Sequence, residues 1–155
     1  MGFGVASKQG SRIIPHACGT LKFDTKVTAN ERLLEIYRGV RRLVEQYQPT
    51  HLAIEKVFFA KNVVSALKLG QARGVAILAV CESNIPVFEY SANEVKASVV
   101  GFGHADKEQV AKMVSRLTGI TQFTSHDSSD ALAIAICHLN SYRHAQRLAE
   151  LTKDL

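Results

Sequence analysis

The sequence predicts an α/β domain with a mixed sheet, because segments with the pattern of strands alternate with segments of helical period. The chain has 155 residues, which is enough for one domain with a sizeable core. Hydrophobic residues make up 46% of it and charged residues 21%, as in soluble globular proteins. No repeat or linker divides the sequence, so we expect a single domain over residues 1–155.

A hairpin is expected first, followed by a helix. Two extended segments, residues 2–7 and 13–23, flank a Lys8-Gln9-Gly10 turn. The helix begins at Thr28, since Thr28-Ala-Asn-Glu31 has the spacing of a capping box. Apolar residues then recur at helical period up to Tyr47-Gln48-Pro49, where the proline ends the pattern.

The middle of the chain predicts a strand, a long helix and a second strand. Residues 51–58 have the composition of a buried strand, residues 62–80 that of the helix, and residues 86–90 that of the second strand. A second capping-box spacing at Ser91-Ala-Asn-Glu94 opens another helix.

Two helices complete the predicted fold. One covers residues 106–117 and stops at Gly119, and the last extends from about residue 127 to near residue 148. Either Asp127 or Ser125 could cap this last helix.

Charge and hydropathy narrow the choice of partners. The formal net charge is +5 and the sequence pI is about 9.2, which favours a polyanionic partner without establishing one. No apolar run approaches the roughly 18 residues that a membrane-spanning helix needs, so we expect no membrane association.

Two glycines four residues apart, Gly70 and Gly74, lie inside the helix predicted over residues 62–80. A glycine within a helix costs up to about 1 kcal/mol relative to alanine, so the pair indicates close packing of another backbone. That backbone could belong to a helix of the same chain or to a second copy, and the sequence leaves both open.

Three carboxylates occur beside strongly apolar segments. Glu55 lies toward the end of an otherwise apolar strand, and Asp127 and Asp130 share one face of a helix just before the uncharged residues 131–137. A desolvated carboxylate has to be paired or bind a cation, and Mg²⁺ prefers oxygen ligands. The alternatives are an ion pair of Glu55 with Lys56 or a helix N-terminus, and a capping role for one aspartate.

Aromatic and basic residues surround these carboxylates in the sequence. Phe58 and Phe59 follow the Glu55 strand, where an aromatic ring could stack on an unpaired base, although a place in the core is the commoner use. Basic side chains that follow the candidate site in the sequence or flank its elements could contact phosphates or form a solvated face. They are Lys56, Lys61, Lys68, Arg73, Lys96, Lys107 and Lys112.

Several segments, in order, resemble the signature segments of the bacterial RuvC family. They are residues 53–62 (AIEKVFFAKN), 65–75 (SALKLGQARGV), 87–90 (VFEY), 95–101 (VKASVVG) and 127–135 (DSSDALAIA). The resemblance extends over about residues 2–144. It implies an RNase H-like fold and a cytoplasmic bacterial endonuclease that resolves four-way (Holliday) junctions in DNA recombination and repair. It also implies a homodimer, two Mg²⁺ ions in the site with Mn²⁺ as a plausible substitute, and the RuvA–RuvB branch-migration complex as partner.

The resemblance also assigns roles to individual residues. Glu55, Asp127 and Asp130 match three of the family's four catalytic, metal-binding carboxylates. Phe58 matches the aromatic residue near the unpaired bases of the junction, and Lys96 and Lys107 match basic residues implicated in DNA contact and catalysis. The predicted DNA-binding residues are therefore Phe58, Lys61, Lys68, Arg73, Lys96 and Lys107.

One departure from the family pattern concerns its first strand, which ends in Asp-Pro-Gly or a close variant before Thr-Gly-Phe/Tyr-Gly-Val. Here Met1 of Met1-Gly-Phe-Gly-Val5 falls at the threonine position, so we expect the central first strand and its aspartate to be missing. Their loss would leave backbone and apolar surface unpaired and impair cleavage. A start codon assigned too far downstream and a true truncation are both possible origins. The alternative function is a non-catalytic remnant that binds junctions or dimerises.

Overall fold

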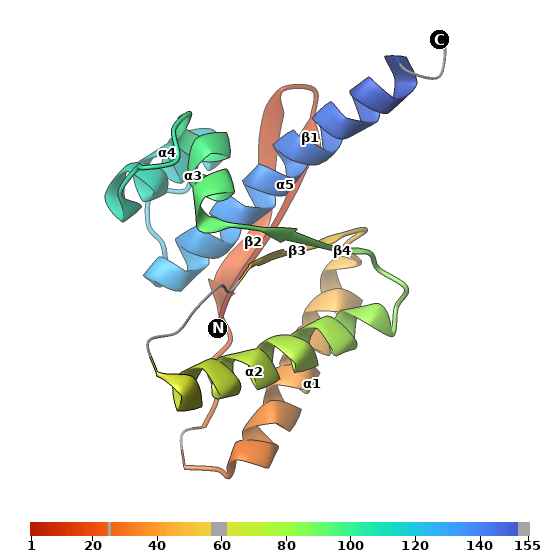
Figure 1. Ribbon diagram of the computed structural model, residues 1–155, viewed down its shortest axis with the longest axis vertical. Helices are drawn as coiled ribbons and strands as arrows, with labels where there is room; N and C mark the ends of the chain where they lie inside the picture. The colour runs from red at the N-terminus through yellow and green to blue at the C-terminus, as the bar shows by residue number, and fades with distance from the viewer. Residues whose placement is uncertain (25, 57–61, 152–155) are drawn as a thin grey trace. The chain divides into compact units, whose positions relative to one another are not determined.

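The computed structural model describes residues 1–24, 26–56 and 62–151, with side chains as far as residue 142 (Figure 1). The chain divides into two compact units. Unit 1 comprises Met1–Thr20 and Tyr90–Leu155, and unit 2 comprises Leu21–Glu89. The single domain predicted over residues 1–155 stays a prediction.

Unit 1 begins with the predicted hairpin. Strands β1 (Gly2–Gln9) and β2 (Arg12–Thr20) pair antiparallel, from Gly2 opposite Thr20 to Gln9 opposite Arg12. Gly10 turns the chain at a φ of 62°, in the left-handed region that glycine adopts without strain. The strands therefore continue one or two residues further into the turn than the sequence indicates.

Three helices complete unit 1: α3 (Ala92–Val100), α4 (Lys107–Thr118) and α5 (His126–Leu151). Both α3 and α4 begin with capping boxes, Ser91 with Glu94 and Asp106 with Gln109, and only the first of these was predicted as such. Helix α4 ends before Gly119, as predicted, where a φ of 75° suits glycine.

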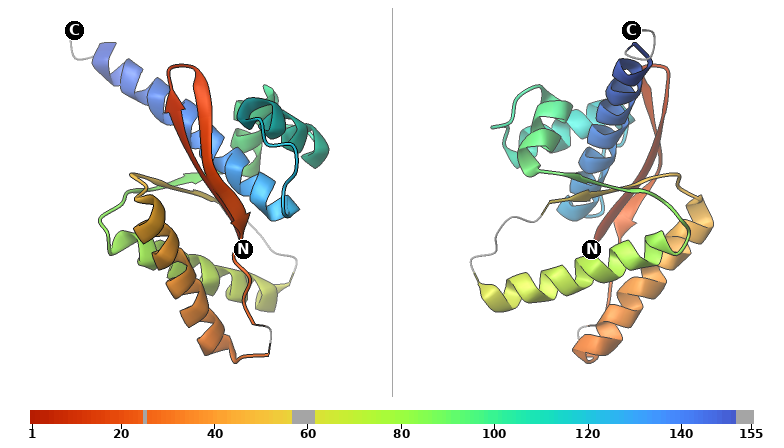
Figure 2. Two further views of the ribbon diagram at one scale, coloured as in Figure 1. Left: turned by 180° about the vertical axis from the view of Figure 1, so that it is seen from behind. Right: turned by 45° about the vertical axis from the view of Figure 1, so that its right-hand side comes forward.

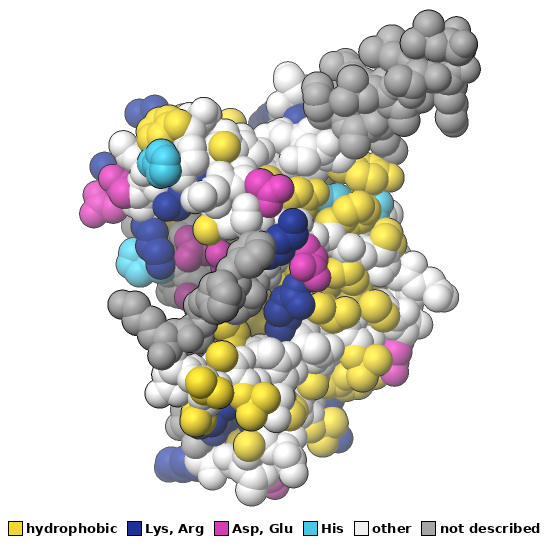
Figure 3. Space-filling view, in the orientation of Figure 1, with side chains coloured by type: hydrophobic (Ala, Val, Ile, Leu, Met, Phe, Trp, Pro, Cys, Tyr) yellow, Lys and Arg dark blue, Asp and Glu magenta, His cyan; other side chains and the backbone are white. Residues whose placement is uncertain are grey.

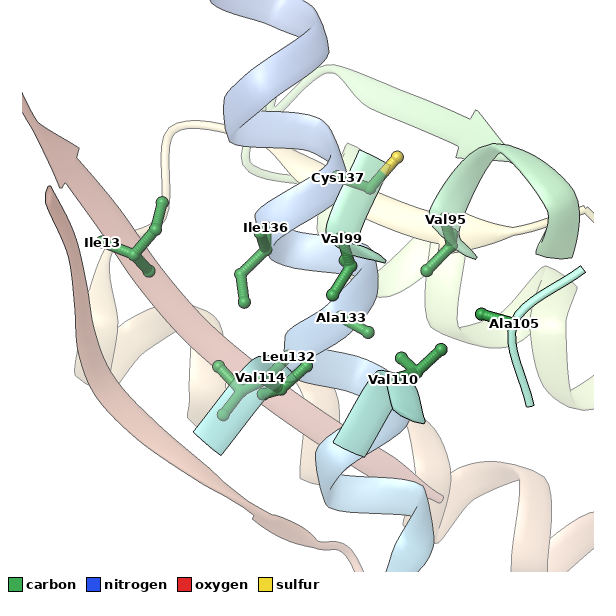
Figure 4. Close-up of a cluster of buried hydrophobic side chains, with 10 residues drawn as sticks. All are labelled: Ile13, Val95, Val99, Ala105, Val110, Val114, Leu132, Ala133, Ile136 and Cys137. Atoms are coloured by element: carbon green, nitrogen blue, oxygen red, sulfur yellow. The ribbon is translucent and has the colours of Figure 1, made fainter. Parts of the chain in front are cut away.

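Helix α5 is the centre of unit 1. It packs against both strands of the hairpin and against α3 and α4, and Figure 2 shows the hairpin lying along it. Apolar side chains from all these elements except β1 meet in one buried cluster around α5 (Figure 4). Its members are Ile13, Val95, Val99, Ala105, Val110, Val114, Leu132, Ala133, Ile136 and Cys137.

Unit 2 contains α1 (Ala29–Tyr47), β3 (Leu52–Glu55) and α2 (Val63–Cys81), and β4 (Val87–Tyr90) leads from it back to unit 1. The capping box predicted at Thr28 is present, and α1 ends at Tyr47, as predicted from Pro49. The core of this unit lies between α1 and α2. Its buried residues are Ile36, Val40, Val44, Ala76, Ala79 and Val80.

The strands form two separate two-stranded sheets within the described residues, β1 with β2 and β3 with β4. In the second sheet, the N–H of Leu52 donates to the carbonyl of Pro86 at 2.9 Å. The strand predicted over residues 51–58 is shorter than expected, because β3 covers Leu52–Glu55 and residues 57–58 lie outside the described part of the chain.

The sequence predicted no apolar segment of membrane-spanning length, but helix α2 is such a segment. By length and composition it could cross a membrane, with a mean hydropathy of 1.5 over its best window. It nevertheless contains two cations, Lys68 and Arg73, and one of its faces packs on α1 to form the core of unit 2. The face of α2 that points away from α1 is also apolar. It is exposed to water unless a second partner covers it.

Candidate functional site

Ser125, and not Asp127, caps the helix that contains both predicted aspartates. The Oγ of Ser125 accepts the N–H of Ser128 at 3.2 Å. In return, the Oγ of Ser128 accepts the N–H of Ser125 at 3.3 Å and donates to the carbonyl of Ser125 at 2.7 Å. Of the two alternatives that the sequence left open, the structure therefore chooses the serine.

The first turn of α5 rests on a buried polar layer. Ser128 and Ser129 are 0% and 3% exposed, and Ser129 Oγ donates to the carbonyl of His126 at 2.8 Å. Both hydroxyl groups form hydrogen bonds within the turn, so their burial does not leave an unsatisfied polar group that would destabilise the fold. The turn is thereby attached firmly to the apolar core that begins at Leu132.

Asp127 and Asp130 stand at the edge of this core. Asp127 is exposed and Asp130 is partly buried. Within the described part of the chain, neither carboxylate takes part in an ion pair or a side-chain hydrogen bond. Two unpaired carboxylates on one rigid turn are suitable ligands for a hard cation such as Mg²⁺.

Glu55 ends strand β3 in unit 2, and its side chain is exposed. Its carboxylate has no ion pair with another described residue, so the predicted alternative of pairing with Lys56 is not observed. The neighbouring Arg73 approaches the backbone instead, with Nε donating to the carbonyl of Glu55 at 3.5 Å. The Nη2 of Arg73 forms an ion pair with the carboxylate of Glu89 on β4 at 2.7 Å, so Arg73 contacts both strands of the β3–β4 sheet.

The three predicted carboxylates are divided between the units. The structure brings Asp127 and Asp130 together in unit 1, whereas Glu55 belongs to unit 2. No group of three His, Cys, Asp or Glu side chains that could hold a metal occurs among the residues that the structure describes. Convergence of Glu55 with the aspartates therefore stays a prediction.

The predicted DNA-binding residues are distributed in the same way. Lys96 on α3 is partly buried and Lys107, the first residue of α4, is exposed, both in unit 1. Lys68 is exposed on α2 in unit 2, where Arg73 is engaged with Glu89. Two of the predicted residues, Phe58 and Lys61, lie outside the described residues.

Sequence reasoning missed a contact that joins the hairpin to the site. The Oγ1 of Thr20, at the end of β2, lies 2.6 Å from the Oγ of Ser125 although 105 positions separate the two residues. No local pattern signals such a pair. Gly2 and Gly4 on β1 did carry a signal, because glycine inside a strand often marks a close approach of another backbone.

Comparisons with known proteins agree on one family. The family model described as "Crossover junction endodeoxyribonuclease RuvC" matches residues 1–138. A protein of that name from Geobacter sulfurreducens is 47% identical over 140 residues, which is 90% of this chain and 85% of the relative. Another, from Geotalea uraniireducens, is 48% identical over 140 residues, 90% of this chain and 82% of the relative.

Two solved structures agree with these sequence matches. "T. thermophilus RuvC in complex with Holliday junction substrate" superposes with a TM-score of 0.88 at 32% identity, covering 93% of this chain and 88% of that one. "Thermus thermophilus RuvC structure" gives a TM-score of 0.83 at 31% identity, covering 93% and 89%. The predicted RNase H-like α/β fold is thereby confirmed.

Proposed function

We propose that this chain, which belongs to the RuvC family of crossover junction endodeoxyribonucleases, cleaves four-way DNA junctions with the help of divalent cations. The observation that carries the proposal is the first turn of α5, where Asp127 and Asp130 project from a turn capped by another residue. Both carboxylates are therefore available to bind a cation, and the helix that carries them packs on a buried core.

Asp127, Asp130 and Glu55 would hold the cations, which we propose to be two Mg²⁺ ions, with Mn²⁺ able to replace them. Bound Mg²⁺ supplies activation of the attacking water and stabilisation of the leaving oxygen. The protein contributes rigid oxygen ligands, since buried Ser128 and the core residue Leu132 keep the first turn of α5 in place.

Contacts to the DNA backbone are proposed for basic residues on several elements. Lys107 and Lys68 are exposed and form no ion pair with another described residue, so each can meet a phosphate without losing a protein partner. Arg73 would first have to leave Glu89. We retain Lys96, Lys61 and Phe58 from the family resemblance, the last as the aromatic residue next to unpaired bases. Phosphate contacts supply affinity that does not depend on sequence.

A second copy of the chain is the proposed partner of α2. Its outer face is a small and apolar stripe, defined by Val63, Leu67, Gly70, Gly74 and Leu78, which recur every three or four residues. The three large members are 83%, 63% and 58% exposed in that order, and a Cβ added to either glycine would meet no atom of another described residue within 4 Å. Hydrophobic side chains accordingly gather at the surface over α2 (Figure 3).

The stripe supports one of the two alternatives that the glycines left open. No helix among the described residues packs against Gly70 or Gly74, so we infer that the close backbone is that of a symmetry-related α2 in a homodimer. Changing Leu67 to glutamate should convert dimers to monomers in sedimentation experiments. Leu34→Glu on α1, where the side chain is 45% exposed, is the matched control and should leave the dimer intact.

The family relationship also suggests a protein partner and a cellular compartment for this chain. The similar relatives are bacterial proteins, and we propose that this chain also acts in the bacterial cytoplasm, together with the RuvA–RuvB branch-migration complex. A pull-down of RuvA–RuvB on a synthetic four-way junction, with and without this chain, tests the association.

A cleavage assay on a synthetic four-way junction tests the proposed activity. With Mg²⁺ present, we expect symmetric nicks on opposed strands from an extended version of the chain that also carries the family's first strand and its aspartate. In this extended chain, Asp127→Asn should abolish the nicks while junction binding in a gel-shift assay persists. Glu108→Gln, which removes an exposed carboxylate from the first turn of α4, is the control and should leave cleavage unchanged.

Two results would count against the proposal. Cleavage that survives in Asp127→Asn would remove Asp127 from the metal site. Junction binding without any nicks by the extended chain would instead support the non-catalytic alternative, in which only recognition and dimerisation remain.

A further inference from the structure

The open end of the hairpin meets the first turn of α5 at two points. Gly2 and Thr20 are directly opposite each other in the β1–β2 ladder. Gly2 lies against Asp127 so closely that an added Cβ would overlap the carbonyl group of Asp127 and come within 2.8 Å of its Cβ. Thr20 Oγ1 lies 2.6 Å from the Oγ of Ser125, the capping residue.

The next glycine of β1 extends this contact. An added Cβ at Gly4 would come within 2.8 Å of the backbone nitrogen of Leu132. Real Cβ atoms do not approach backbone this closely, so a side chain at either glycine would push β1 and α5 apart. The strand therefore supports the helix over its first two turns, with backbone against backbone.

We propose that the Gly2–Thr20 pair positions Asp127 for metal binding. Both are positioning residues, since they act on the ligand through the backbone of α5 and through Ser125. The inference rests on the proposed function, in which Asp127 is a metal ligand. Thr20 prevents the capped start of the helix from moving away from the sheet, and Gly2 sets how closely the turn approaches it.

The coordination chemistry explains why such positioning matters. Mg²⁺ demands nearly ideal octahedral geometry with oxygens at about 2.0–2.1 Å, so a shift of a few tenths of an ångström in a ligand weakens binding. Partners that orient metal ligands typically change metal affinity by about 10- to 100-fold when removed. Thr20 contacts Ser125 and not the proposed ligand Asp127, so its effect is indirect. We therefore expect its removal to weaken metal binding by about three- to tenfold, less than for a direct partner.

The test measures Mn²⁺ binding to the full chain by electron paramagnetic resonance, without reference to cleavage. Thr20→Val removes the hydroxyl at nearly constant shape, and Thr20→Ser keeps it. The control is Thr118→Val, because Thr118 Oγ1 also makes part-buried hydrogen bonds in unit 1: it donates to the carbonyl of Val114 at 2.7 Å and accepts the N–H of Ile120 at 3.3 Å. Thr118→Val should lower the melting temperature at least as much as Thr20→Val.

We expect weaker Mn²⁺ binding in Thr20→Val, normal binding in Thr118→Val, and recovery in Thr20→Ser. Gly2→Ala should weaken Mn²⁺ binding as well, compared with Gly103→Ala, where the nearest atom is at an ordinary 3.6 Å. Equal Mn²⁺ affinity in Thr20→Val and the unchanged chain would overturn the inference, as would an equal loss in Thr118→Val.

Asp127→Asn separates this inference from the proposed function. If Mn²⁺ binding is the same in Asp127→Asn as in the unchanged chain, the proposed metal site itself is wrong. If Asp127→Asn loses the ion but Thr20→Val does not, the metal site stands and only the positioning role is refuted.

Discussion

Replacing Ser125 by alanine is expected to lower the free energy of unfolding by about 2 kcal/mol, because the side chain makes two separate contributions. As the cap of α5, its Oγ accepts the N–H of Ser128, and loss of such a cap typically costs about 1 kcal/mol. The part-buried hydrogen bond with Thr20 at 2.6 Å adds roughly another 1 kcal/mol.

Urea unfolding followed by circular dichroism measures this loss, provided that the slope m is unchanged. Ser91→Ala is the matched control, since the Oγ of Ser91 caps α3 by accepting the N–H of Glu94 at 3.3 Å. Loss of this cap should cost about 1 kcal/mol. A double-mutant cycle of Ser125→Ala with Thr20→Val should give a coupling energy of about 1 kcal/mol. Strict additivity, or equal losses in Ser125→Ala and Ser91→Ala, would refute the reasoning.

Further predictions concern the core, a thiol and the DNA surface. Leu132→Ala should cost about 2–5 kcal/mol in urea unfolding because Leu132 is 0% exposed, whereas Leu117→Ala, at 39% exposure, should stay within about 0.5 kcal/mol. Burial raises the pKa of the Cys137 thiol above its ordinary 9.0, so the unfolded chain ionises first and stability should fall as the pH rises above that value. A thiol reagent at neutral pH should accordingly modify exposed Cys81 well before Cys137. Lys107→Ala should reduce the salt dependence of junction binding by about one unit of slope in a log–log plot, and an unchanged slope would exclude a phosphate contact there.

The helix starts at Thr28 and Ser91 could be predicted because their signals are local. Each capping box joins residues three positions apart, so the spacing in the sequence already contains the contact. Pro49 and Gly119 likewise end α1 and α4 through their own backbone preferences. Where the determinants lie within one turn, sequence and structure agree.

The start of α5 could not be decided in this way. Ser125 and Asp127 are both good caps two residues apart, so local preference favours neither strongly. Ser125 is favoured by Thr20, which is 105 positions away and bonds to it. Gly2 packs against Asp127 in the same turn and is further still along the chain. Contacts of this kind depend on how the hairpin packs, and no spacing in the sequence records them.

The outer face of α2 shows a different limit. The sequence indicated that Gly70 and Gly74 need a close neighbour, but apolar residues on all sides of a helix do not say which face is internal. The structure assigns Ala76, Ala79 and Val80 to the core with α1. The glycines remain on the other side, where no atom from the described part of the chain would lie within 4 Å of an added Cβ.

The position of the cap decides what the two aspartates can do. If Asp127 were the cap, its carboxylate would accept backbone N–H groups, and Asp130, three residues later, would stand where a capping box turns its side chain back to the same turn. Both carboxylates would then satisfy the helix itself. With Ser125 as the cap, Asp127 becomes the second residue of the helix, where its oxygens are not consumed by capping the backbone. Ser125 thus leaves both carboxylates of this turn available for the proposed metal site, and a change at Ser125 should affect metal binding as well as stability.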